Sequence, residues 1–527
     1  SNRLTMEGLT IILYCVVLLF FPLIFLFISR LHGRKKLGAK DEKTKKLPPG
    51  PPALLFIAKF FSLEPSIFQI GPILRGLHAR HGPIISIWLL RPFVFVADRR
   101  LAHSVLVESG GNFDDRPPPS EMLRLFFPHT ITTSTYGAYW RLVRRNLSSQ
   151  ALHPSRVRLF APARQRALDA TTGLLLRRDQ DMDASQGHQG VTLRPLLRRC
   201  LFELLVCMCL GVRLDQEALE ELQEMLLQVF NAITAFPVFD FFPALTKRLL
   251  LRKRWARLLA LRDRRDQVLL RLIRSRGRGR GGGAEEDQVP GGYCYADSLL
   301  ELRVAEEGGR PLTDAEMVNL CSEFMIAATD TSLSMIEWIM AELVNRPDIQ
   351  AKVYEEVRSQ PDLSEGDNMR QGMPYLKALA LEGLRLHPLG HLVIPHGVRS
   401  DGEVGGYAVP KGAELNFLVS DWGLDETVWP AAREFRPERF LEEEEDSDLD
   451  ITGSRGIKMA PFGAGRRMCP GYTLAMLHAE FFVGSLVRDF QWLPPAQGQS
   501  TVDMTEDQAS VICMKHPLRA RIIPRTT

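Results

Sequence analysis

The chain has 527 residues, of which 45% are hydrophobic and 24% charged, and its formal net charge is +4. This length is ample for a large packed core. Length alone would suggest about three or four domains, but no clear linker divides the bulk of the chain, so one large domain is also possible. The small basic excess gives no indication of nucleic-acid binding. Eight cysteines show neither paired zinc spacing nor a regular disulfide framework, which is typical of a reducing compartment.

Residues 1–30 have the features of a membrane anchor. Leu9–Ile28 is almost entirely apolar and has about the twenty residues needed to cross a bilayer. Its one proline, Pro22, is tolerated in membrane helices. No cleavage site follows, so a removable signal peptide is not indicated, and Met6 would be a natural start. Lysines and arginines are concentrated after this segment, which places the rest of the chain in the cytosol by the positive-inside rule.

Residues 31–52 combine basic side chains with prolines and end in Leu47-Pro48-Pro49-Gly50-Pro51-Pro52. Such a run cannot form a helix and favours a stiff, polyproline-like spacer. We predict a hinge here, followed by one large domain formed by residues 53–527.

The rest of the chain predicts a mainly helical protein with small β-sheets. Ile84–Asp98 alternates and is rich in branched and aromatic residues, which predicts a β-hairpin, and from about Leu101 the pattern is mainly helical. Arg252–Arg274 repeats apolar residues at helical spacing, so its many arginines are expected on a solvated helix face. Arg276–Gly283 resembles an RNA-binding RGG tract, but it is short and flanked by acidic residues, which favours a flexible surface loop.

A cluster of aromatic residues lies between two helical segments, with Pro237 and Pro243 among them. It consists of Phe236, Phe239, Phe241 and Phe242. These side chains can dip into a bilayer and admit a lipophilic compound from it, or they can form buried core, and the sequence does not decide between the two.

One cysteine, Cys469, lies in a glycine-rich turn before a predicted helix, Tyr472–Phe490. The glycines would let the backbone approach something flat and bulky. Backbone N–H groups and the start of the helix would face the sulfur and favour its thiolate. A lone thiolate in a tight loop suits the axial ligand of a haem iron, whereas the common alternative is a small buried hydrophobic residue.

Three further patterns can carry chemistry. Trp140 and Arg144 are four residues apart, so on a helix they share a face and can grip a carboxylate, although an exposed helix arginine is the usual outcome. The predicted helix Met317–Val344 holds Ala327-Ala328-Thr329-Asp330-Thr331, in which Thr331 can simply bond back to a carbonyl. Glu382-x-x-Arg385 is spaced as a salt bridge, which at a surface is worth less than about 1 kcal/mol.

Together these motifs resemble the cytochrome P-450 family, in the order that the family has them. Phe462-x-x-Gly465-x-Arg467-x-Cys469-x-Gly471 matches every fixed position of its haem-binding signature. The residues in these motifs are most similar to those of plant microsomal A-type members, in particular family eighty-nine. The resemblance implies the cytochrome P-450 fold, a single large domain after a transmembrane helix.

The resemblance also implies a role for particular residues. Cys469 would be the thiolate ligand of haem b, with O2 as co-substrate, and the oxygen-side residues would be Asp330 and Thr331; Ala328 departs from the family's usual glycine. Haem-binding positions would be Trp140, Arg144, His396, Phe462, Gly465, Arg467 and Gly471. A buried charged triad behind the cysteine loop would consist of Glu382, Arg385 and Arg439.

The expected substrate pocket is apolar, which is also what a protein core looks like. From the family's positions it would be lined by Leu125, Phe126, Phe127, Phe324, Ala327, Leu392, Val393 and Val511.

The implied activity is a monooxygenase of the endoplasmic reticulum membrane, single-pass and facing the cytosol, that oxidises a lipophilic small molecule. Electrons would come from NADPH through NADPH–cytochrome P-450 reductase, with cytochrome b5 as a second candidate donor, and Arg466 could meet the reductase or be plainly solvated. Two alternatives are an oxygen-independent haem-thiolate isomerase or dehydratase, and a non-catalytic haem-binding membrane protein. The Asp330–Thr331 pair favours the monooxygenase.

Overall fold

A computed structural model gives the structure of most of the chain. The residues that it describes are 46–53, 56, 70–89, 91–183, 190–235, 238–240, 245–278, 292–358, 372–441, 450–495, 501–508 and 511–525. The predicted membrane segment Leu9–Ile28 and the phenylalanines Phe236, Phe241 and Phe242 lie outside this part. Within the described residues, no helix combines the length and the apolar character of a membrane span.

Helices make up most of the described chain, as predicted. They are α3 (Ile70–His81), α4 (Arg99–His103), α5 (Gly110–Phe113), α6 (Glu121–Phe126), α7 (Ala138–Asn146), α8 (Pro154–Arg158), α9 (Ala161–Asp183), α10 (Arg194–Leu210), α11 (Gln216–Thr234), α13 (Arg252–Arg278), α14 (Tyr295–Glu301), α15 (Asp314–Asn345), α16 (Pro347–Val357), α18 (Pro374–Leu386) and α19 (Tyr472–Asp489). Short π-helical turns are η3 (Ser104–Glu108), η4 (Leu147–Ala151) and η5 (Thr246–Leu250); 3-10 turns are η7 (Ala305–Glu307), η8 (Val419–Leu424), η9 (Pro437–Phe440) and η10 (Gly465–Arg467).

The strands form small sheets. The largest has the order β1 (Ile84–Trp88), β2 (Pro92–Val96), β9 (Glu414–Phe417) and β6 (His396–Gly397); a second has β10 (Phe490–Leu493), β13 (Arg519–Pro524) and β3 (Val191–Thr192). The remaining strands pair as β4 (Arg303–Val304) with β5 (Arg310–Pro311), β7 (Gly402–Val404) with β8 (Tyr407–Val409), and β11 (Glu506–Gln508) with β12 (Ile512–Met514).

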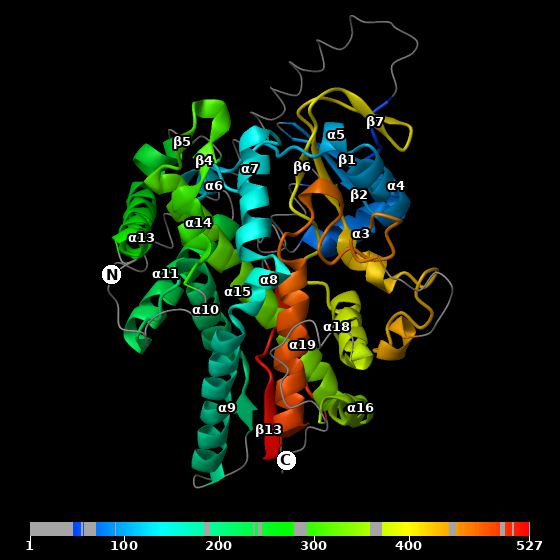
Figure 1. Cartoon of the computed structure of the whole chain (residues 1–527). Coiled ribbons are helices and arrows are strands. Elements are labelled where there is room, and N and C mark those ends of the chain that lie inside the picture. Colours follow the sequence, from blue (N-terminus) through cyan, green and yellow to red (C-terminus); the bar gives the residue numbers. More distant parts are fainter. Residues whose placement is uncertain are drawn as a thin grey trace, which may run out of the picture.

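The predicted hairpin over Ile84–Asp98 is confirmed as β1 and β2. The two strands are antiparallel, with Ile84 opposite Val96 and Ser86 opposite Val94. Because successive side chains point to opposite faces of a strand, Ile85 and Ile87 pack with α3 on one face, while Ile84 and Val94 join a separate apolar cluster on the other. Figure 1 shows β1, β2 and β6 at the upper right, with α9, α10 and α19 extending below them.

Helix α15 is the centre of the core and contains the predicted Met317–Val344. It begins with a capping box: the Glu316 N–H donates to the Thr313 hydroxyl (3.2 Å) and the Thr313 N–H donates to the Glu316 carboxylate (2.7 Å). Most of its side chains are buried, and α10, α13, α14, α18 and α19 pack against it. This explains why a helix with little amphipathic pattern is stable here.

Two segments differ from what the sequence predicts, namely the proline-rich spacer and the basic helix. The proline-rich residues are not a free spacer where the structure describes them, because Ser86 of β1 donates from its N–H to the Pro49 carbonyl (2.8 Å) and from its hydroxyl to the Pro48 carbonyl (2.6 Å). The arginines of α13 are not all solvated either. Arg265 is 1% exposed, and it donates to the Phe126 carbonyl at the end of α6 and to the Asn319 side chain of α15.

Candidate active site

The cysteine loop lies between the polypeptide that follows η9 and the start of α19. The Cys469 N–H donates to the Phe462 carbonyl (2.9 Å), and the Met468 N–H donates to the Gly465 carbonyl (3.1 Å). Gly463 and Gly465 have φ of +71°, a left-handed conformation that favours glycine. A Cβ on Gly465 would also overlap the carbonyl oxygen of Leu106 in η3. The close approach at this glycine is therefore to neighbouring backbone, which the sequence did not indicate.

The Cys469 side chain has exposed surface, yet burial raises the pKa of its thiol. Both observations follow if the sulfur faces a recess inside the protein. The Gly471 N–H and the nearby Arg144 guanidinium lower this pKa, but burial is the larger effect. The N–H group of Gly471 therefore acts on the thiol in the predicted direction, and burial opposes it. A metal ion would deprotonate a coordinating thiol outright.

One ridge of α15 is less buried than the rest of the helix. Asn319, Glu323, Ala327 and Thr331 follow one another at intervals of four residues and so share a face of the helix. Ala327 is exposed although it lies in the middle of the most buried helix. The Thr331 hydroxyl donates to the Ala327 carbonyl (2.7 Å), so the back-bonding alternative is what the structure contains. The methyl of Ala328 packs against the main core.

Asp330 lies on a different side of α15 from Thr331. Its carboxylate accepts from Arg198 of α10, with Nη2 at 2.8 Å and Nε at 3.2 Å. The side chains of Asp330 and Arg198 are 19% and 34% exposed, so this ion pair is partly hydrated. The sequence analysis treated the Asp330 carboxylate and the Thr331 hydroxyl as one pair. In the structure these two groups have separate hydrogen-bond partners.

Three guanidiniums converge beside the cysteine loop, from Arg116, Arg144 and Arg467. Burial and the other two arginines lower the pKa of Arg116 to about 9, and burial lowers that of Arg467 to about 10. Within the described part of the chain, no carboxylate lies within ion-pair distance of these three groups. They donate instead to carbonyls: Arg144 to Met468 (2.6 Å) and Arg467 to Ser134 (2.8 Å). Such a cluster of like charges is suited to carboxylates from a ligand.

Trp140 and His396 lie at the same cluster. The Trp140 indole N–H donates to the Ile131 carbonyl (3.1 Å), and the Arg467 guanidinium is 4.4 Å from the centre of a Trp140 ring. The Nδ1 of His396 is 2.7 Å from the Phe113 carbonyl, so it carries the proton. Burial, followed by the charge of Arg116, lowers the pKa of His396 to about 3. The imidazole is therefore neutral here, whereas the sequence interpretation placed a basic group at this position.

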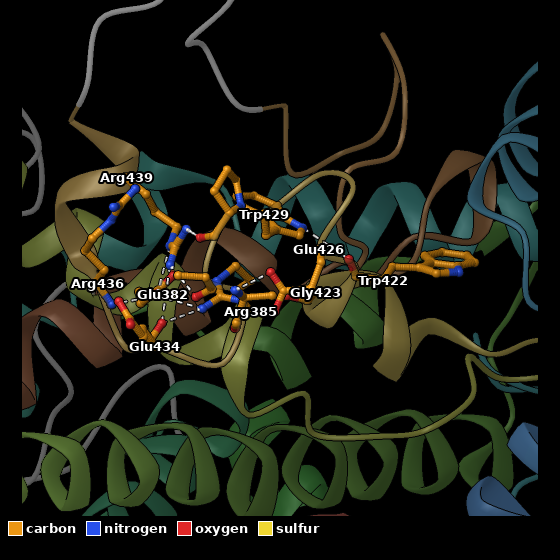
Figure 2. A network of polar contacts seen from close by, with 12 residues as sticks. Glu382, Arg385, Trp422, Gly423, Glu426, Trp429, Glu434, Arg436 and Arg439 are labelled. Carbon is orange, nitrogen blue, oxygen red and sulfur yellow. Dashed lines mark hydrogen bonds and ion pairs between the residues drawn. The ribbon is translucent and has the colours of Figure 1, made fainter.

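The charged residues behind the cysteine loop form one buried network (Figure 2). Glu382 and Arg385 of α18 make two hydrogen bonds, of 2.6 and 2.7 Å, and both side chains are fully buried. Arg439 of η9 donates to Glu382 from Nε (3.1 Å), and the Arg436 N–H donates to the same oxygen (2.7 Å). Arg385 also donates to carbonyls of the segment between η8 and η9, including Ala432 (2.6 Å). The network thus ties α18 to the polypeptide that leads towards the cysteine loop.

Comparisons with known proteins decide the family. The sequence profile described as "Cytochrome P450" matches residues 48–522. The chain is 41% identical to cytochrome P450 89A9 of Arabidopsis thaliana, over 92% of this chain and 94% of that protein. The chain belongs to the cytochrome P450 family. The predicted resemblance to plant members of family eighty-nine is confirmed by this relative.

Other relatives agree. The chain is 32% identical to ent-cassadiene hydroxylase of Oryza sativa subsp. japonica, over 87% of this chain and 88% of that protein, and 30% identical to geraniol 8-hydroxylase of Catharanthus roseus, over 99% and 100%. A zebra fish cytochrome P450 structure with progesterone shares the fold, with a TM-score of 0.67 and 21% identity, covering 87% of this chain and 99% of that one. The predicted cytochrome P450 fold, mainly helical with small sheets, and the predicted oxidoreductase class are thereby confirmed.

The residues present fit the haem that cytochrome P450 proteins carry. A thiol in a recess can supply the axial ligand, and a cluster of guanidiniums with an indole can hold two propionates. Cys469 would hold the iron, while Arg144, Arg467 and Trp140 would hold the carboxylates. Arg116 belongs with them, although the sequence interpretation missed it. Its signal was present, because an arginine follows two acidic residues and precedes a proline in the segment Phe113–Pro117.

The expected pocket residues divide into two groups. Phe126 and Phe127 are buried in a packed cluster with Val229 of α11, and Phe324 is buried against Tyr295 of α14, with ring centres 5.6 Å apart. The half-buried or exposed members are Leu125, Ala327, Leu392, Val393 and Val511. Ile394, which the sequence analysis did not name, is 51% exposed beside Val393. The second group has the accessible apolar surface that a lipophilic ligand needs.

Arg466 also has a defined place. Its Nη1 donates to Asp114 (2.8 Å), its guanidinium is 5.3 Å from the centre of the Tyr136 ring, and its side chain is 53% exposed. It is therefore neither a fully solvated charge nor a buried one.

Proposed function

We propose that this cytochrome P450 is a membrane-anchored monooxygenase that inserts one oxygen atom of O2 into a lipophilic small molecule, with two electrons from NADPH through NADPH–cytochrome P-450 reductase. The observation that carries the proposal is the joint presence of a recessed Cys469 thiol, a guanidinium cluster beside it and the Thr331 hydroxyl on the open ridge of α15. Cytochrome b5 is a second candidate donor.

Each group has a distinct task in this proposal. Haem held by Cys469 supplies the oxidising chemistry. Arg116, Arg144 and Arg467 bind its carboxylates and fix its orientation. Thr331 holds a proton at Oγ1, which it now shares with the Ala327 carbonyl and can pass into the recess by rotating its hydroxyl.

Asp330 would join this proton path only by loosening its ion pair with Arg198, which is partly hydrated and so weaker than a buried pair. Gly465 and Gly471 have no side chain, so they would let the cysteine loop fold tightly enough for its N–H groups to face the Cys469 sulfur.

The substrate class is supported by apolar surface and by the relatives. Ala327, Leu392, Val393 and Val511 are apolar side chains with accessible surface, and Ile394 adds to this surface. Two relatives are named hydroxylases of ent-cassadiene and of geraniol, both lipophilic compounds. A lipophilic substrate is therefore the class we assign.

A membrane location is supported by an apolar surface patch in addition to the predicted anchor. Leu245, Leu249 and Leu250, in and beside η5, are 44%, 71% and 50% exposed. Arg248, in the same turn, and Arg252 at the start of α13 are exposed and basic, which is the combination that lies at an anionic membrane surface. The anchor, this patch and the basic residues after Leu9–Ile28 favour the endoplasmic reticulum membrane, with the domain in the cytosol.

The proposal is tested with the haem-loaded full chain. The reduced protein with carbon monoxide should show the red-shifted Soret band of a thiolate-ligated haem, and Cys469→Ala should abolish it. With reductase, NADPH consumption should rise on addition of a substrate found by spectral shifts in a library of plant lipophilic metabolites. A thiolate band with product formation but no NADPH use would indicate the isomerase or dehydratase instead. A thiolate band without turnover of any compound that binds would indicate the non-catalytic protein.

A further inference from the structure

The polypeptide between α6 and α7 is held from the central helix by a carboxylate. The Ile131 N–H donates to Oε2 of Glu323 (3.0 Å), and the Thr132 N–H donates to Oε1 of the same side chain (2.8 Å). Hydrogen bonds to an ionised carboxylate are roughly twice as strong as neutral ones. Two successive peptide groups are therefore fixed to one residue of α15.

The carbonyls of the same residues face the guanidinium cluster. The Ile131 carbonyl accepts from the Trp140 indole (3.1 Å) and from Nη1 of Arg467 (3.2 Å), and the Thr132 carbonyl accepts from Nε of Arg116 (3.0 Å). Residues 131 and 132 thus take hydrogen bonds from three side chains that would hold the haem carboxylates, while they donate to Glu323. Hydrogen bonds arranged in such chains polarise one another.

The charge of Glu323 acts on the cluster as well. Burial raises the pKa of Glu323, and the hydrogen bonds from Thr132 and Ile131 oppose that rise. In return, its negative charge raises the pKa values of Arg116 and Arg144, against the lowering by burial. It is a partly buried acid of α15 that lies near guanidiniums without an ion-paired carboxylate in the described part of the chain.

Glu323 also lies one helical turn before Ala327, the exposed residue on the same ridge of α15. Asn319, one turn earlier, donates to the Pro128 carbonyl (3.1 Å) of the same polypeptide. The ridge therefore binds this polypeptide through Asn319 and Glu323, directly before its exposed part.

We infer that Glu323 is a positioning residue for the haem. Through residues 131 and 132 it sets the position of the arginine and tryptophan side chains that hold the propionates, and its charge offsets theirs. It does not contact the reacting atoms.

The test uses a matched pair of glutamates in the haem-loaded full chain. Glu356 of α16 accepts from two successive backbone N–H groups as Glu323 does, from Tyr375 and Leu376, both at 2.8 Å, and burial raises its pKa too. It serves the start of α18 and not the guanidinium cluster. The variants are Glu323→Gln, Glu323→Asp and Glu356→Gln. The measurements are the rate of haem transfer to apomyoglobin and the midpoint reduction potential of the iron.

For Glu323→Gln we expect haem transfer to be about ten-fold faster, as for the loss of a group that orients a ligand of a metal site. We also expect a more positive potential, because a nearby negative charge has been removed. Glu323→Asp keeps the charge and should keep the potential, while its shorter side chain should speed transfer. Glu356→Gln should change transfer by less than about two-fold, as for a site without such a role.

Equal transfer rates for Glu323→Gln and Glu356→Gln would overturn the inference. If Glu323→Gln takes up no haem at all, Glu323→Asp decides: transfer at the wild-type rate would overturn the inference, and faster transfer at an unchanged potential would support it. The inference rests on haem binding by this site, whereas failure of the proposed monooxygenase activity would appear separately, as a wild-type protein that consumes no NADPH.

Discussion

Replacing Glu382 by Gln should destabilise the fold strongly. Oε1 of Glu382 accepts from Arg385, Arg439 and the Arg436 N–H, and Oε2 accepts from Arg385 at 2.6 Å. Glutamine keeps one oxygen and turns an N–H2 group towards one of these donors. It also removes the only charge that both guanidiniums contact in this network, while Arg385 stays fully buried. Leaving such a charge unpaired costs about 3–5 kcal/mol.

A second pair with the same spacing provides the control. Glu355 and Arg358 are also three residues apart and form a 2.9 Å ion pair, but their side chains are 58% and 57% exposed. Glu355→Gln should therefore change the free energy of unfolding by less than about 0.5 kcal/mol. Urea unfolding of the detergent-solubilised, haem-loaded chain, followed by far-ultraviolet circular dichroism, measures both variants. A loss below about 1 kcal/mol for Glu382→Gln would refute the reasoning, because that is the range of a surface pair.

Three further changes test other parts of the structure. Gly465→Ala should destabilise the cysteine loop by about 2 kcal/mol or more, because its φ of +71° is strained for alanine and the new Cβ overlaps the Leu106 carbonyl; urea unfolding with the visible haem band as probe measures this. Burial lowers the pKa of His478 to about 3, so its contribution to stability is complete above the unfolded pKa of about 6.5 and is lost as the pH falls towards 3. His478→Gln should thus weaken the fall in stability between pH 6.5 and 4.5. Arg116→Gln should speed haem transfer to apomyoglobin by about ten-fold, and transfer at the wild-type rate would show that this guanidinium does not hold a propionate.

The parts of the fold that could be predicted depend on local patterns. The hairpin of β1 and β2 follows from alternation over a few residues, and α15 and α19 follow from long apolar segments with clear ends. The spacing of Glu382 and Arg385 indicates a pair in the sequence, and the fold brings Arg439 to it from 54 residues further along the chain. Such signals lie in residue type and spacing, which the sequence displays directly.

What could not be predicted depends on contacts between distant segments. The pKa of Cys469 is set mainly by burial, which no local motif reports. The low pKa of His396 follows from its burial and, after that, from the charge of Arg116, 280 residues away in the chain, while Asp330 has its own partner in Arg198 on α10. Arg265 belongs to a basic run that is predicted to be solvated, and the packing of α13 against α15 and α6 buries it.

The guanidinium cluster links haem binding to folding. Arg116 and Arg467 have lowered pKa values, so bringing their charges together without water opposes the folded state. Propionates would pair with these charges, and a ligand that binds only the folded chain adds to its stability. Until haem binds, the segments around the guanidinium cluster must be held by contacts that do not depend on the cofactor. Glu323 of α15 holds residues 131 and 132, and the buried network of Glu382 on α18 holds the polypeptide that leads towards the cysteine loop. A chain that lacks either one should therefore lose its haem before it loses its helices.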